Sequence, residues 1–106
     1  MKKIMVLSQN TALINKIKPT PNVVLIYDSF MTVFEQLNFH SPDYIIFDFN
    51  CSCIDQSQSF MLESLPKKDE ENYIKLVAIG SCDNSDNLAD FYLKVRNVAS
   101  LDVSSL

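Results

Sequence analysis

The sequence contains very little glycine and histidine. One glycine and one histidine occur in 106 residues, and tryptophan is absent. A loop that cradles phosphate groups with backbone amides needs several glycines, so the glycine-rich nucleotide-binding motifs are excluded. A serine hydrolase is also disfavoured, because the chain has no Gly-x-Ser-x-Gly turn and its single histidine, His40, falls in an expected loop.

Cysteine is also scarce. Cys51, Cys53 and Cys82 form neither a Cys-x-x-Cys pair nor a repeating pattern, and His40 adds only one more candidate metal ligand. An odd number of irregularly spaced cysteines argues against the disulfide framework of a small secreted protein. We therefore expect reduced cysteines in or near loops, and neither a zinc site nor a redox pair.

Long hydrophobic runs are missing as well. None approaches the roughly 18–20 residues that a membrane-spanning helix needs, and the apolar run after the first lysines is too short for a signal peptide. The formal net charge of −4 argues against a broad basic surface for nucleic acid. The expectation is a cytoplasmic protein without membrane contact, which would reach DNA only through a module outside this chain.

Apolar runs alternate with amphipathic stretches along residues 1–106, which predicts one α/β domain. Strands are expected at 4–7, 23–27, 44–48, 75–79 and 101–103, and helices at 12–17, 30–37, 60–65 and 88–99. This alternation implies a parallel sheet with right-handed crossovers and helices on both faces. The last helix depends on the spacing of Leu88, Phe91, Tyr92 and Val95, and it has Lys94 on its polar side.

The third strand ends at an acidic residue. Four apolar residues, Tyr44 to Phe47, run directly into Asp48, and Ser41-Pro42-Asp43 forms a turn signal before them. Successive apolar residues indicate a strand covered on both faces. Because ligands of open α/β sheets bind outside the carboxyl ends of the strands, Asp48 is the main candidate for a functional side chain. A polar residue left at a strand end is an equally weighted interpretation.

The order of elements and the stretch from Ser41 to Asn50 resemble the receiver domain of two-component response regulators. In receivers a Pro-Asp pair, an apolar strand and a terminal aspartate occur in this arrangement, and the aspartate accepts a phosphoryl group from a histidine kinase. The resemblance implies a flavodoxin-like, doubly wound five-stranded parallel sheet, here without the usual last helix. It puts Asp48 at the phosphoacceptor position, Asn50 where a backbone carbonyl helps hold magnesium, and Ser81 where a hydroxyl senses the phosphoryl group.

Two features of that family are missing. Ser8 and Gln9 stand where receivers carry the acidic pair that binds magnesium. The receiver lysine at the end of the fifth strand would fall near Ser104 or Ser105, and Lys94 aligns with it only if the fourth helix is left out. Magnesium needs anionic oxygen ligands, and a lysine offsets charge during phosphoryl transfer. We therefore expect at most weak magnesium binding, no other cofactor, no catalytic residue, and slow or absent phosphorylation.

The function expected from this resemblance is that of an atypical receiver in signal transduction or transcription regulation. It would work independently of phosphorylation, through a protein partner or a homodimer. The contact face would be formed by the fourth helix and fifth strand, where Asp90, Lys94 and Arg96 could pair across a dimer.

Two alternatives stay open. One is a phosphorylatable receiver of a phosphorelay, with a rearranged metal site that uses Asp28, Asp55 or Asp83. The other is a small α/β phosphocarrier such as the sugar-transport IIB enzymes, which need a nucleophilic cysteine where this chain has Ser8. The alternatives differ in the group that would carry the phosphate, so the surroundings of Ser8 and Asp48 distinguish them.

Overall fold

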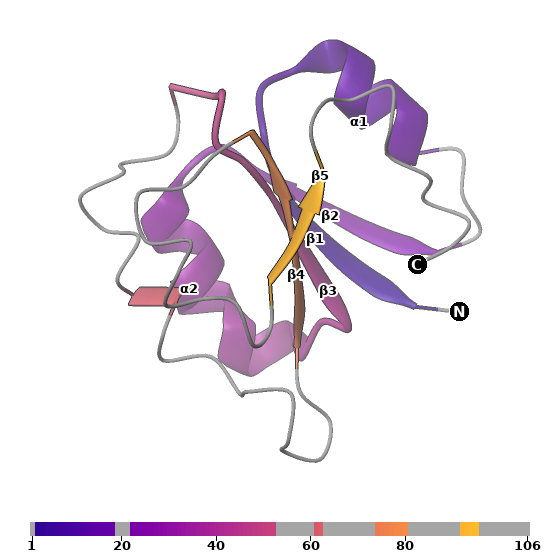
Figure 1. Ribbon diagram of the computed structural model, residues 1–106. Coiled ribbons are helices and arrows are strands. Elements are labelled where there is room, and N and C mark those ends of the chain that lie inside the picture. Colours follow the sequence, from indigo (N-terminus) through magenta and orange to yellow (C-terminus); the bar gives the residue numbers. More distant parts are fainter. Residues whose placement is uncertain (1, 19–21, 53–60, 63–73, 81–91, 96–106) are drawn as a thin grey trace.

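The computed structural model of the protein describes residues 2–18, 22–52, 61–62, 74–80 and 92–95. These residues form an α/β fold with a parallel sheet, as predicted (Figure 1). The elements follow in chain order as β1 (Lys3–Leu7), α1 (Thr11–Ile17), β2 (Val23–Tyr27), α2 (Phe30–His40), β3 (Tyr44–Asp48), β4 (Lys75–Ile79) and β5 (Tyr92–Val95).

The sheet has the strand order β2-β1-β3-β4-β5. The chain therefore moves outward from β1 to β2, crosses back to β3, and continues to β4 and β5 on the other side. β1 and β3 lie next to each other at the point where this direction reverses, with Leu7 in register with Phe47. The loop after β1 and the end of β3 consequently meet at the switch point of the sheet, where ligands of such sheets usually bind.

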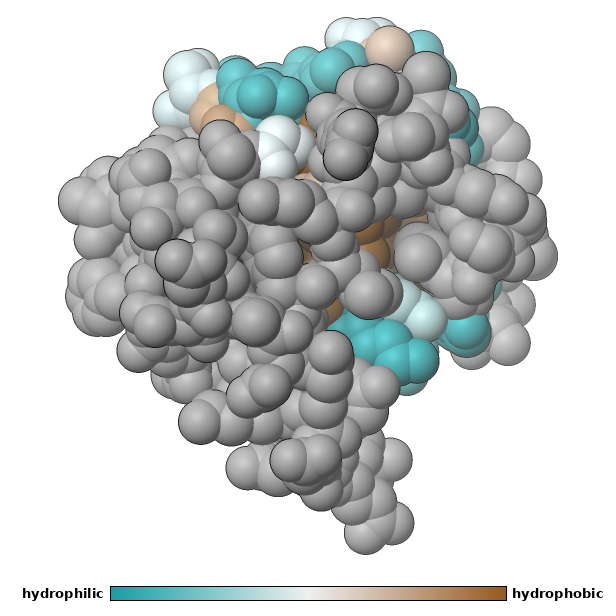
Figure 2. All heavy atoms as spheres, in the orientation of Figure 1, coloured by the Kyte–Doolittle hydropathy of each residue, from teal (hydrophilic) through white to brown (hydrophobic). Residues whose placement is uncertain are grey.

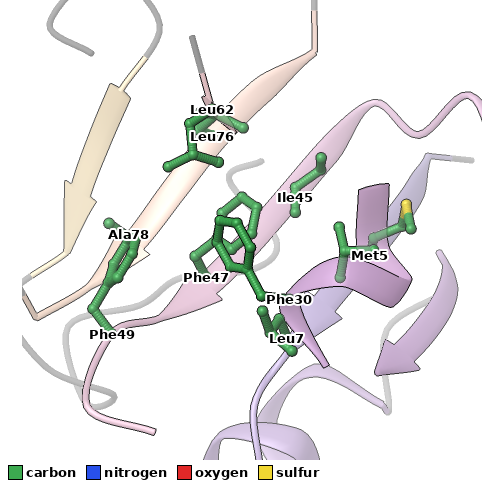
Figure 3. Packing of buried hydrophobic residues seen from close by; sticks show 10 residues of the cluster. Met5, Leu7, Phe30, Ile45, Phe47, Phe49, Leu62, Leu76 and Ala78 are labelled. Carbon is green, nitrogen blue, oxygen red and sulfur yellow. The ribbon is translucent and has the colours of Figure 1, made fainter. Parts of the chain in front are cut away.

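The two helices cover opposite faces of the sheet. On one face α2 packs on side chains of β1, β3 and β4, and Figure 3 shows the rings of Phe30 and Phe47 against each other, with centroids 5.6 Å apart. On the other face Leu13 and Ile17 of α1 pack on the same three strands. All five residues of β3 are buried, which confirms the prediction from its unbroken apolar run.

The helix ends follow local capping chemistry. The side chain of Asn10 accepts hydrogen bonds from the backbone amides of Ala12 and Leu13 at the start of α1. Ser29 caps α2 in the same way, and Ser41 ends that helix with a left-handed φ of 44°. The expected second helix is therefore confirmed but extends further, so His40 is its last residue and not part of a loop.

The expected helix over residues 88–99 is wrong at its centre, because Tyr92–Val95 is strand β5 and pairs in parallel with β4. Four residues are too few for their spacing to distinguish a strand from a helix. Tyr and Val favour strands, and β4, a buried strand, has backbone groups that need a second partner. The fifth strand expected at 101–103 lies outside the described residues.

Only Met61 and Leu62 of the expected third helix are described, and they form a 3₁₀ turn in which Leu62 is buried. None of the helices in the described part of the chain is long and apolar enough to cross a membrane. On the face shown in Figure 2, described hydrophilic residues lie along the upper rim and in a second group in the lower part of the view.

Candidate functional site

Asp48 is buried at the carboxyl end of β3, with an exposed fraction of 2%. One carboxylate oxygen, Oδ2, accepts a hydrogen bond of 2.7 Å from the hydroxyl of Ser8. The other, Oδ1, accepts one of 3.0 Å from the backbone amide of Asn50. Bonds to an ionised acceptor are stronger than neutral ones and offset part of the cost of burying the carboxylate. Both oxygens of Asp48 thus have protein donors.

Ser8 connects three elements at this edge. It follows β1 directly, and its backbone amide donates to the carbonyl of Tyr27 at the end of β2 over 3.3 Å. Its Oγ donates to Asp48 and accepts from the backbone amide of Asn10, 2.9 Å away, just before α1. Ser8 is 2% exposed, whereas Gln9 beside it is exposed. The structure therefore brings Ser8 into contact with Asp48 and leaves Gln9 on the surface.

Asn50 lies in the turn after β3, over the end of β4. Gly80 follows β4 with a φ of +87°, and a Cβ added there would come 2.8 Å from Oδ1 of Asn50. The amide of Phe49 also donates to the carbonyl of Ile79 over 2.9 Å. The single glycine of the chain thus permits a left-handed turn and a close approach of two loops. Ser81, the expected sensor of the phosphoryl group, lies outside the described residues.

The described residues offer few ligands for a cation. No group of three or more His, Cys, Asp or Glu that could hold a metal occurs among them. Asp28 is exposed after β2 and belongs to no such group, and Asp55 and Asp83 lie outside the described part of the chain. With one buried carboxylate and a neutral hydroxyl, the described portion of the site lacks the anionic oxygens that magnesium prefers.

Lys94 lies in a strand and not in the helix expected over residues 88–99. Counted forward from Ser81, the resemblance to receivers places their lysine near Ser104 or Ser105. The fifth strand of the sheet instead ends at Val95, and Lys94 is its next-to-last residue, in register with Ala78. A lysine is thus present near the carboxyl end of β5. The sequence offered one sign of this position: if the fourth helix is left out of the alignment, Lys94 aligns with the receiver lysine.

Cys51 also departs from expectation. It is disulfide-bonded, so the prediction of reduced cysteines is wrong for this residue. Its backbone amide donates to the carbonyl of Asp48 over 3.0 Å, which fixes the turn that follows β3. Cys53 and Cys82, the other two cysteines, lie outside the described residues.

No protein-family model matches the chain, and no curated protein matches its sequence. A function is therefore inferred from the fold and from the surroundings of Asp48. These surroundings are a buried carboxylate at the switch point of a parallel sheet, held by a serine hydroxyl and a backbone amide.

Proposed function

We propose that this chain is an atypical receiver domain with a flavodoxin-like fold, and that it acts in signal transduction through protein contacts without phosphorylation. The strand order β2-β1-β3-β4-β5 supports the fold, because it is the order of flavodoxin-like sheets. The end of β3 at the switch point supports the receiver assignment, because Asp48 stands where receivers carry their phosphoacceptor.

The hydrogen bond from Ser8 to Asp48 is the observation that carries this proposal. Receivers use an acidic pair after the first strand to bind magnesium beside the phosphoacceptor. Here Ser8 takes that place and donates to Oδ2 of Asp48 over 2.7 Å. A neutral hydroxyl satisfies the carboxylate without a metal, but it offers little affinity for a hard cation. Phosphoryl transfer to Asp48 would then lack the charge compensation it needs.

Without phosphorylation, such a domain would work through its surface. We propose a protein partner or a homodimer at the β5 end of the sheet, where β5 has β4 as its sheet neighbour. Because residues 92–95 form a strand, the contact face includes β5 itself and not the middle of a fourth helix. Three charged residues were expected to pair there, Asp90, Lys94 and Arg96, and Lys94 is among the residues that the structure describes. Any contact with DNA would belong to a module outside this chain.

A phosphorylatable receiver is the second candidate, and one observation favours it. Lys94 lies near the carboxyl end of β5, at the same edge of the parallel sheet as Asp48. A lysine at this edge is the cation that receivers use to stabilise the transferred phosphoryl group. This candidate still requires a metal site built from acids outside the described residues.

Intact-mass measurement tests the two candidates directly. The protein is incubated with acetyl phosphate and magnesium, and the Asp48→Ala variant serves as the control. The first proposal predicts no phosphoryl adduct in either protein. An adduct that appears in the unmodified chain and vanishes in Asp48→Ala would refute it and support the second candidate. In that case Lys94→Met should slow formation of the adduct by about 10²-fold or more, as loss of one electrostatic contact does elsewhere.

A further inference from the structure

The turn after β3 ends at a cysteine that belongs to a disulfide. The backbone amide of Cys51 donates to the carbonyl of Asp48 over 3.0 Å, so residues 48–51 form a hydrogen-bonded β-turn. Within this turn the amide of Asn50 donates to Oδ1 of Asp48, also over 3.0 Å. Cys51 is partly exposed, and Ser52 after it is exposed. The disulfide is therefore attached to the turn that supplies one of the two donors to the buried carboxylate.

The chain has three cysteines, and one disulfide uses two of them. The partner of Cys51 is therefore Cys53 or Cys82, and the other cysteine is left over. Cys53 is two residues after Cys51. Cys82 is two residues after Gly80, where an added Cβ would meet the side chain of Asn50. Because two residues extend at most about 7 Å, chain connectivity keeps all three cysteines in the neighbourhood of this turn.

These features suit a disulfide that exchanges with thiols. In such an exchange a thiolate attacks one sulfur of the disulfide and bonds to it, and the other sulfur leaves and takes up a proton. The thiolate must reach the bond, and the partly exposed position of Cys51 meets this condition. The disulfides that hold small secreted proteins together use an even number of cysteines, which does not match the three of this chain.

We propose that the Cys51 disulfide is a redox-sensitive site, which low-molecular-weight thiols open and which controls the turn that holds Asp48. In the complete reaction two thiol groups of the reductant are oxidised to one disulfide. The sulfur–sulfur bond of Cys51 breaks, and its two sulfurs take up the two hydrogens as thiols. Loss of the bond removes a restraint on the turn, so the amides of Asn50 and Cys51 open more readily. The proposal does not depend on the receiver assignment, because it involves no phosphoryl group.

Alkylation at defined thiol ratios tests the chemistry on the full chain. The protein is equilibrated with mixtures of reduced and oxidised glutathione, free thiols are alkylated with iodoacetamide, and peptide mapping by mass spectrometry follows Cys51. We expect its disulfide to form and open reversibly over this series, and the map to identify its partner. A Cys51 thiol that is alkylated at every ratio would overturn the proposal. A disulfide that persists in the folded protein at the most reducing ratio would do the same.

Amide hydrogen exchange followed by NMR tests the coupling to Asp48. Reduction with dithiothreitol should speed exchange of the Asn50 and Cys51 amides by about tenfold or more. The amide of Leu13, which is capped at the start of α1, should be unaffected. Equal exchange of the Asn50 amide in the oxidised and the reduced protein would overturn the proposal.

Two serine variants separate loss of the bond from other effects of the reductant. Cys51→Ser cannot form the disulfide, so its Asn50 amide should exchange rapidly with and without dithiothreitol. The matched control is the serine variant of the cysteine that the peptide map shows to be left over, Cys53→Ser or Cys82→Ser. It keeps the disulfide and should respond to dithiothreitol like the unmodified chain. Slow exchange of the Asn50 amide in folded Cys51→Ser contradicts the proposal, and circular dichroism confirms the folding of each variant.

Discussion

Ser8 and Asp48 are forty positions apart in the sequence, and their side chains meet at 2.7 Å. The Ser8 hydroxyl has two roles, because it donates to Asp48 and accepts from the amide of Asn10. The bond to Asp48 is buried, and the bond from the Asn10 amide is partly buried. Ser8 is thus expected to contribute to the stability of the fold.

Removing this hydroxyl should therefore destabilise the protein. Ser8→Ala leaves Oδ2 of Asp48 without its serine donor and the Asn10 amide without its acceptor. We expect the free energy of unfolding to fall by about 1–3 kcal/mol, measured by urea denaturation. The neighbouring Gln9→Ala change, at an exposed position, should stay within about 0.5 kcal/mol. Equal free energies of unfolding for the two variants would show that the hydrogen bonds of the Ser8 hydroxyl do not stabilise the protein.

Gly80 is the other residue whose identity is constrained by geometry. Gly80→Ala adds a Cβ at a φ of +87° and 2.8 Å from Oδ1 of Asn50. The left-handed backbone alone costs a non-glycine residue about 1–2 kcal/mol, and the contact with Asn50 adds to it. A double-mutant cycle with Asn50→Ala separates the two costs, because it removes the contact and leaves the φ strain. We expect partial recovery; full recovery would mean that φ contributes no strain.

At the scale of elements, the core is divided into two clusters by the sheet. On one face Phe30 of α2 packs against Phe47, whose ring stacks with Phe49. On the other face α1 packs on isoleucine and valine side chains and on Tyr44. Right-handed crossovers that run in opposite directions across a sheet place their helices on opposite faces, and here the chain moves from β1 out to β2 and then back to β3. The aromatic cluster connects α2 directly to β3 and hence to Asp48.

A pair of phenylalanines on these elements tests how much the aromatic cluster contributes. Phe47 on β3 is 1% exposed, and Phe39 on α2 is 78% exposed. Phe47→Ala should lower the free energy of unfolding by about 3–5 kcal/mol, because it leaves a cavity in the core. Phe39→Ala should change it by no more than about 0.5 kcal/mol. Thermal or urea unfolding measures both, and a comparable loss in the two variants would contradict the packing described here.

At the scale of the whole molecule, the sheet has a stable centre and a weaker edge. β1, β3 and β4 are largely buried, whereas β2 lies at the edge of the sheet, with Val23 41% and Ile26 36% exposed. Every strand pairing is parallel and joins segments distant in sequence. Opening of β2 therefore disturbs fewer contacts than opening of the centre.

Native-state hydrogen exchange should reveal this difference. Amides of β3 are expected to exchange only through global unfolding, and amides of β2 through a local opening of lower free energy. Exchange followed by NMR at increasing, sub-denaturing urea concentrations measures both. The β3 amides should show the strong urea dependence of global unfolding, and the β2 amides a weak one. Indistinguishable urea dependence would mean that the sheet opens as one unit.

Local patterns were sufficient to predict most of the fold. The bounds of β2 and β4 agree with the apolar runs Val23–Tyr27 and Lys75–Ile79, and Asp48 ends β3 as expected. These strands can be predicted from the sequence because a buried strand needs an unbroken apolar run. A helix on a sheet, in turn, needs an apolar stripe and a capping residue, and both are features of neighbouring residues.

Three features depended on contacts between distant segments. Tyr92–Val95 has side chains that suit a helix or a strand, and pairing with β4 decides for the strand and moves Lys94 into it. The bond of Ser8 to Asp48 exists because the sheet order sets β1 beside β3. The positions of Lys2 and Lys75 over the ring of Tyr44 likewise need β1, β3 and β4 to start at one edge. Local sequence patterns therefore determined the separate strands and helices from β1 to β4, and the tertiary structure decided β5 and which side chains meet, because local periodicity contains no information about strand order.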